Sequence, residues 1–145
     1  MFFGDVVNRG VMPALDKMLA FTQARQRMLA ENVANIDNPH YRTKQLDASA
    51  FQKALREALE TQKETGSAHF RVSESSELKQ DEQGHLIVTP SEEPPENVLF
   101  HDDTNASIER QMQQMAENSM MHQIATELLR ERFGVLQKAI SGKVM

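Results

Sequence analysis

The longest amphipathic stretch of the chain is NASIERQMQQMAENSMMHQIATELLRERFGVLQKAISG, residues 105–142. Its apolar positions recur at alternating spacings of four and three residues over more than four heptads, which predicts a helix that pairs with another helix. We expect Asn105 or Ser107 to cap its start and Gly142 to end it. The positions of the predicted paired face are Ile108, Met112, Met115, Ser119, His122, Thr126, Leu129, Phe133, Leu136 and Ile140.

A second long helix is predicted over residues 9–36. Pro13 is compatible with a helix only near its beginning, and Pro39 marks the end because the residue before a proline avoids helical angles. Two polar residues, Arg25 and Asn32, interrupt the apolar series. The series is Val11, Leu15, Met18, Thr22, Arg25, Leu29, Asn32 and Ile36.

We expect the two long helices to pair as a coiled-coil-like hairpin. The residues predicted to form this contact are Val11, Leu15, Met18, Leu29, Ile36, Ile108, Met112, Met115, Leu129, Phe133, Leu136 and Ile140. Both helices also carry apolar residues away from the paired face, and a helix that is apolar on opposed faces must be buried on both. These second-face residues are Phe21, Met28, Met121, Ile124, Leu128 and Val135. Either other protein chains cover them, or the middle of the chain folds over them as an ordinary three-helix bundle.

The middle of the chain divides into two segments. Residues 37–59 are predicted to hold a turn and a short helix that begins at a capping box, Ser49 to Gln52. Residues 60–104 carry three basic and eleven acidic residues, a composition typical of a flexible segment. A weak hairpin is the alternative, with strands at residues 70–72 and 86–89 around Gly84. The predicted fold is therefore mainly α, a single domain over 1–145, with helices at 9–36 and 105–142.

Composition excludes several classes of protein. The net charge of −5 argues against a nucleic-acid binder, and the absence of cysteine excludes disulfides and thiol catalysis. No apolar run is long enough to span a bilayer, and the N-terminus lacks the pattern of a cleaved secretory signal. No phosphate-binding or catalytic motif is present, and the run His101, Asp102 and Asp103 is not accompanied by further metal ligands. We therefore expect no catalytic, cofactor-binding or metal site, and no enzyme activity.

One short stretch is highly specific. Residues 29–42 read LAENVANIDNPHYR, in which a helix stops at a proline-containing turn followed by an aromatic residue. This stretch resembles the N-terminal motif of bacterial flagellar axial proteins, although Asn38 and His40 replace the usual threonine and glycine. Residues 104–112, 116–119 and 133–143 are similar to the C-terminal helix of the flagellar basal-body rod family, above all its B-type proximal members. The matched motif positions are Asn32, Val33, Ala34, Asn35, Pro39 and Tyr41.

The resemblance implies a structural subunit of the flagellar rod. Such subunits polymerise through their terminal helices into the shaft that carries torque from motor to hook. The resemblance also implies export by the flagellar type III apparatus without signal cleavage, a place in the rod within the periplasm, and other rod and basal-body proteins as partners. We expect a monomer before assembly, with no insertion into the membrane.

Two other interpretations stay open at this stage. A soluble helical adaptor or secretion chaperone would share the acidic charge and the amphipathic helices. A C-type proximal rod protein is similar in length. The sequence leaves the number of rod subunits and the neighbours of each subunit undetermined.

Overall fold

The computed structural model describes residues 10–92 and 104–142, with side chains from residue 108 in the second range. Three helices, α2 (Val11–Ala34), α3 (Ala48–Thr65) and α4 (Thr104–Ile140), account for most of these residues. The strands are short: β1 (Lys44–Gln45), β2 (Leu78–Gln80), β3 (Leu86–Val88) and β4 (Ser91–Glu92). The prediction of a mainly α fold with two long terminal helices is confirmed.

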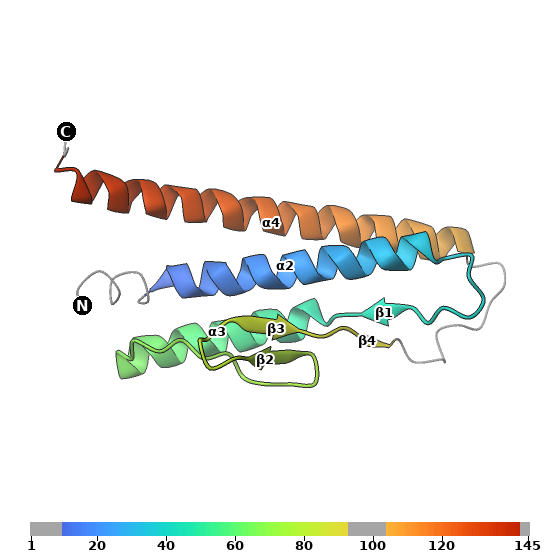
Figure 1. Ribbon diagram of the computed structural model, residues 1–145, viewed down its shortest axis with the longest axis horizontal. Coiled ribbons are helices and arrows are strands. Elements are labelled where there is room, and N and C mark those ends of the chain that lie inside the picture. Colours follow the sequence, from blue (N-terminus) through green and yellow to red (C-terminus); the bar gives the residue numbers. More distant parts are fainter. Residues whose placement is uncertain (1–9, 93–103, 143–145) are drawn as a thin grey trace.

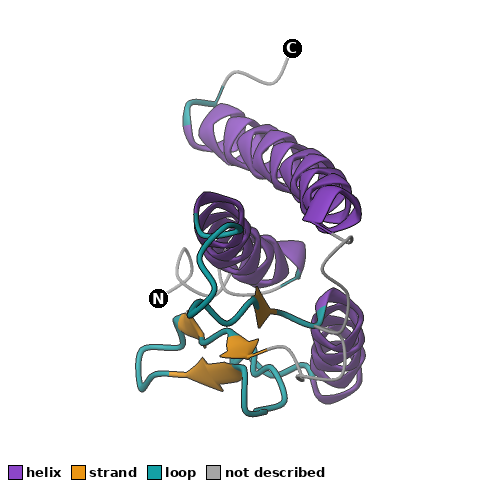
Figure 2. Ribbon diagram, turned by 90° about the vertical axis from the view of Figure 1, so that its right-hand side faces the viewer, coloured by secondary structure: helices purple, strands orange, loops and turns teal. Residues whose placement is uncertain are grey.

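The elements form three layers with α2 in the middle (Figure 1). Seen from the end, α2 lies between α4 on one side and α3 with the strands on the other (Figure 2). Helix α4 runs antiparallel to α2, because Gln111 contacts Asn32 near the end of α2 while His122 contacts Thr22 near its middle. The middle of the chain therefore does fold over one face of the N-terminal helix, as the three-helix alternative required.

The apolar core lies between α2, α3 and the segment that carries the strands. Its centre is a stacked aromatic pair, Phe21 of α2 and Phe51 of α3, with ring centroids 4.0 Å apart and both side chains fully buried. The buried members of this core all belong to residues 14–78, and Met115 is the α4 residue that packs against it. The core is Ala14, Phe21, Met28, Leu29, Leu46, Phe51, Ala54, Leu55, Ala58, Phe70, Val72 and Leu78.

Helix α3 begins and ends at residues with clear local roles. The side chain of Asp47 accepts a hydrogen bond from the Ala50 amide at 2.9 Å, so Asp47 is the N-cap and the predicted capping box at Ser49 was wrong. The helix continues to Thr65 and stops at Gly66, whose φ of 61° is readily adopted only by glycine. Helix therefore extends into the first residues of the segment predicted to be flexible.

The predicted hairpin around Gly84 exists, with one strand corrected. Strand β3 pairs antiparallel with β2, and not with residues 70–72. Phe70 and Val72 instead contact the side chain of Gln80, which accepts from the Val72 amide at 2.8 Å and donates to the Phe70 carbonyl at 3.3 Å. The side chain of Gln80 thus bonds the backbone of residues 70–72, where a neighbouring strand was predicted to pair. A second antiparallel pair, β1 with β4, was not predicted.

The position of the core gives a first stability prediction. Phe51→Ala should lower the free energy of unfolding by about 3–5 kcal/mol, because it removes half of a fully buried aromatic pair. Phe133→Ala on α4 is the matched control and should cost less than about 1 kcal/mol, since Phe133 is 52% exposed. Urea unfolding followed by circular dichroism measures both values. Equal losses would contradict a core that closes without α4.

Candidate functional site

The Asn-Val-Ala-Asn motif lies at the end of α2, where the chain turns toward β1. Asn32 is 3% exposed and its carboxamide makes four hydrogen bonds. Its Oδ1 accepts from the Tyr41 hydroxyl at 2.9 Å and from the Lys44 amide at 3.0 Å. Its Nδ2 donates to the Lys44 carbonyl at 2.8 Å and to Gln111 Oε1 at 3.3 Å. One side chain therefore joins α2 to the motif turn, to β1 and to α4.

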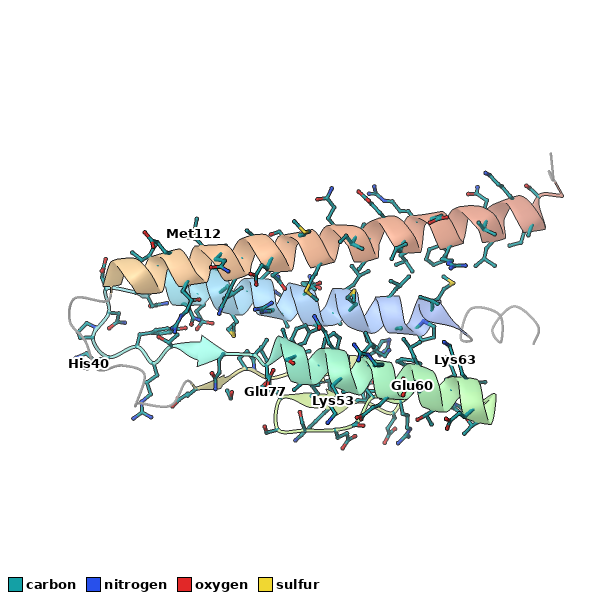
Figure 3. The ribbon with its side chains drawn as sticks, turned by 180° about the vertical axis from the view of Figure 1, so that it is seen from behind. His40, Lys53, Glu60, Lys63, Glu77 and Met112 are labelled. Atoms are coloured by element: carbon teal, nitrogen blue, oxygen red, sulfur yellow. The ribbon has the colours of Figure 1, made fainter. Side chains whose placement is uncertain are left out.

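The turn after the motif is closed by local hydrogen bonds. Asn35 caps α2 with its backbone and its side chain, both of which donate to the Glu31 carbonyl. The Asn38 amide donates to the Asn35 carbonyl at 2.9 Å, and the Asn38 side chain accepts from the His40 amide at 3.1 Å. Among the described residues only glycines have a positive φ, so His40 closes this turn without the conformation that glycine would allow. Figure 3 shows His40 in this turn at the end of the molecule.

The electrostatics of the turn fit a hydrogen-bonded, neutral Tyr41. Burial of the phenol, followed by the nearby Glu31 carboxylate, raises the pKa of Tyr41 above its usual value. The Glu31 carboxylate also accepts a hydrogen bond from Lys44 Nζ at 2.8 Å and so raises the pKa of Lys44. Tyr41 therefore stays protonated and donates to Asn32 throughout the neutral pH range.

Side-chain hydrogen bonds join α2 to α4 along their contact. Thr22 Oγ1 lies 2.8 Å from His122 Nδ1, and Asn118 Nδ2 donates both to the Thr22 carbonyl at 2.8 Å and to Gln26 Oε1 at 3.0 Å. We call this contact the α2–α4 seam; it consists of Thr22, Gln26 and Asn32 on α2 with Gln111, Asn118 and His122 on α4. Paired polar groups of this kind fix the register of two helices more than they stabilise them.

Arg25 also lies buried on α2, which explains why it interrupts the predicted apolar series. Burial lowers its pKa, and the Glu117 carboxylate partly offsets that effect. Its Nε and Asn118 Oδ1 are buried without a hydrogen-bond partner among the described residues. Such groups weaken the seam, because a buried polar atom without a partner costs free energy.

The predicted helix-pairing residues divide into three groups by burial. Leu15 and Leu29 are buried in α2, whereas Val11, Met112, Phe133 and Ile140 have exposed side chains. The other six are half-buried: Met18, Ile36, Ile108, Met115, Leu129 and Leu136. The reason is a rotation of α4. Its buried positions are Gln111, Asn118 and Ala125, one residue before the predicted Met112, Ser119 and Thr126. The four exposed residues, Val11, Met112, Phe133 and Ile140, therefore do not pair the two helices within one chain.

The predicted second-face residues also differ in burial. Phe21 and Met28 are 0% and 3% exposed, in the core under α3 and the strands, so their predicted exposure to other chains is corrected. Met121 is half-buried. Ile124, Leu128 and Val135 are exposed on α4, which leaves this helix as the place where apolar surface remains uncovered.

Seven of the nine large apolar side chains that are exposed within the described ranges belong to α4. At about 100° per residue they fall on two sides of the α2–α4 seam. The first flank consists of Met120, Ile124, Leu128 and Val135, and the second flank consists of Met112, Phe133 and Ile140. Met120 was not predicted. Its neighbours in the first flank were found because they fall opposite the predicted paired face.

No group of three possible metal ligands occurs in the part of the chain with described side chains, and His101 to Asp103 lie outside it. The predicted caps Asn105 and Ser107 also have no described side chains. A search of the described helices found none with the length and hydropathy of a membrane span.

Comparison with known proteins supports the resemblance to the flagellar rod family. Three curated relatives carry the name flagellar basal body rod protein FlgB. The protein of Borrelia hermsii is 24% identical over 110 residues, which cover 75% of this chain and 79% of the relative. The Bacillus subtilis protein is 22% identical over 133 residues (92% and 95%), and the Salmonella typhimurium protein is 24% identical over 147 residues (91% and 99%). Neither a protein-family profile nor a solved structure matches the chain. The similarity thus extends well beyond the two terminal blocks and favours the B type.

The four hydrogen bonds of Asn32 give a second prediction. Asn32→Ala should lower the free energy of unfolding by about 1–3 kcal/mol, because it leaves half-buried groups of Lys44 and Tyr41 without partners. Asn35→Ala is the matched control from the same motif and should cost only about 0.5 kcal/mol, since its side chain makes an exposed bond. Thermal or urea unfolding of both variants measures the difference. A smaller loss for Asn32→Ala than for Asn35→Ala would contradict the assigned role.

Proposed function

We propose that this chain is a structural subunit of the bacterial flagellar basal-body rod. The observation that carries the proposal is the apolar surface of α4, which stays exposed after the rest of the chain has closed its core. The resemblance to rod proteins over most of the chain supports the same assignment. The subunit's role is mechanical: it forms part of the shaft that carries torque from motor to hook.

The two flanks of α4 favour assembly into an open array. The flanks differ in composition and lie on opposite sides of the seam, so a contact between the first flank of one copy and the second flank of the next is heterologous. Heterologous contacts do not close into a dimer, and they build rings or helical filaments. Other rod and basal-body proteins of similar helical form are the expected neighbours at the ends of such an array. Close packing of many side chains along α4 would give the shaft its stiffness under torque.

The state before assembly follows from the same features. A free subunit exposes the first flank together with Met112 and Ile140 of the second, and it is expected to be a monomer at low concentration, held for export by the flagellar type III apparatus without signal cleavage. Its partners cover the flanks only after it reaches the rod in the periplasm. Burial of a large apolar side chain contributes roughly 1.5–3 kcal/mol, so a few flank residues suffice to hold one copy on the next.

Charge placed on the first flank tests the proposal. The double variant Leu128→Asp and Val135→Asp should abolish motility of a host that depends on this gene, because a buried unpaired carboxylate strongly disfavours the contact between copies. Its monomer should keep the circular dichroism and unfolding midpoint of the wild type, since both residues are exposed there. The matched control, Gln52→Asp and Thr61→Asp, adds the same charge at exposed positions of α3, away from both flanks, and should stay motile.

Fractionation distinguishes the rod subunit from an adaptor or secretion chaperone. The wild-type chain should be recovered in purified basal bodies, and the Leu128→Asp, Val135→Asp chain should be absent from them. An adaptor would stay in the cytosolic fraction in both cases. Collapse of the variant monomer would contradict the proposal in a different way, because it would show that the first flank belongs to the internal core.

A further inference from the structure

A cleft lies at the beginning of α2, where three parts of the molecule meet. Its volume is about 290 Å³. Its walls are Met12 and Pro13 of α2, Leu129 and Phe133 of α4, and the hairpin turn at residues 83–85. The polar part of the lining consists of the Asp16–Lys17 ion pair, Gln83 and His85. The cleft thus has an apolar side, formed by Met12, Pro13, Leu129 and Phe133, and a polar side, in the region where α4 reaches the start of α2.

The cleft is large enough for an aromatic ring. A dry apolar cavity of about 150 Å³ is known to hold benzene, and this cleft has nearly twice that volume. Phe133, which forms one wall, is 52% exposed, and Val11 beside the cleft is 45% exposed. An apolar group placed in the cleft would therefore remove surface from water on both helices.

The chain itself provides such groups next to the cleft. The nine residues before Gly10 read MFFGDVVNR and include Phe2, Phe3, Val6 and Val7. Gly10 has a φ of 83°, a conformation that glycine adopts readily and that is not helical, so α2 begins after it. Nine residues reach at most roughly 30 Å, and the cleft begins only two residues after Gly10.

We propose that Phe2 and Phe3 dock into this cleft in the same chain. The short connection gives the phenylalanines an effective concentration in the millimolar range, far above that of a second copy in dilute solution. The contact is apolar and fills the slot between Met12 and Phe133. Because Phe133 belongs to the second flank, the docked segment covers part of the surface that we assign to assembly. The contact concerns the free chain and does not depend on the proposed function.

A cysteine probe at the edge of the cleft tests this docking. The chain has no native cysteine, so Gln83→Cys introduces a single thiol in the cleft wall without altering its apolar residues. In this background, replacing both phenylalanines (Phe2→Ser and Phe3→Ser) should raise the rate of thiol alkylation roughly three- to tenfold. The free energy gained by burying the aromatic rings is only slightly larger than the conformational entropy that the segment loses on docking. The expected protection is therefore moderate. A Gln52→Cys probe on the exposed side of α3 is the control, and its alkylation rate should not change.

Two further variants separate docking from other causes. Phe2→Leu with Phe3→Leu should retain the protection, because the contact is apolar. Phe133→Ser should remove it, because it takes away a wall of the cleft. Circular dichroism of each variant checks that the helix content is unchanged.

Two results would overturn the proposal. An alkylation rate at Gln83→Cys that is unaffected by the serine substitutions would show that the phenylalanines do not occupy the cleft. Protection that disappears on roughly tenfold dilution would show that they dock onto a second copy, since contacts within one chain do not depend on concentration.

Discussion

Phe21 of α2 stacks on Phe51 of α3 with 4.0 Å between ring centroids, and this contact closes one face of the N-terminal helix within the chain. The core around it draws its buried members from residues 14–78. The other face of α2 contacts α4, where the hydrogen bonds of the α2–α4 seam leave Asn118 Oδ1 without a partner among the residues that the structure describes. Helix α4 contributes no fully buried member to this core, and it is the element with the most exposed apolar side chains among the described residues.

The motif turn connects these two halves of the structure. Asn32 contacts β1, Tyr41 and Gln111 at the same time, so the geometry of the turn and the start of α4 depend on one side chain. This explains in physical terms why the motif contains an asparagine at this point: a carboxamide can accept and donate toward one backbone residue and still reach another helix. A buried residue of this kind specifies a unique arrangement, while the flanks of α4 stay exposed.

The sequence predicted the long helices well, because their spacing and the turn at Pro39 depend on local rules. It predicted the paired face of α4 only in part. Met115, Leu129 and Leu136 were placed near α2, but the apolar series gave no sign that Gln111 and Asn118 would be buried in place of Met112 and Ser119. Gln111 and Asn118 face α2 because they form hydrogen bonds with Asn32, Thr22 and Gln26, which lie 79 to 96 residues away in the sequence. Phe21 was misplaced for a similar reason, since its partner Phe51 is contributed by a separate helix.

Amide hydrogen exchange of the free monomer tests most directly whether α4 is held apart from the core. Amides in residues 118–136 of α4 are expected to exchange clearly faster than those in residues 15–29 of α2, because opening of the α2–α4 seam leaves the core intact. Equal protection of both helices, with exchange only on global unfolding, would show that α4 is an integral part of one cooperative core and would contradict the account.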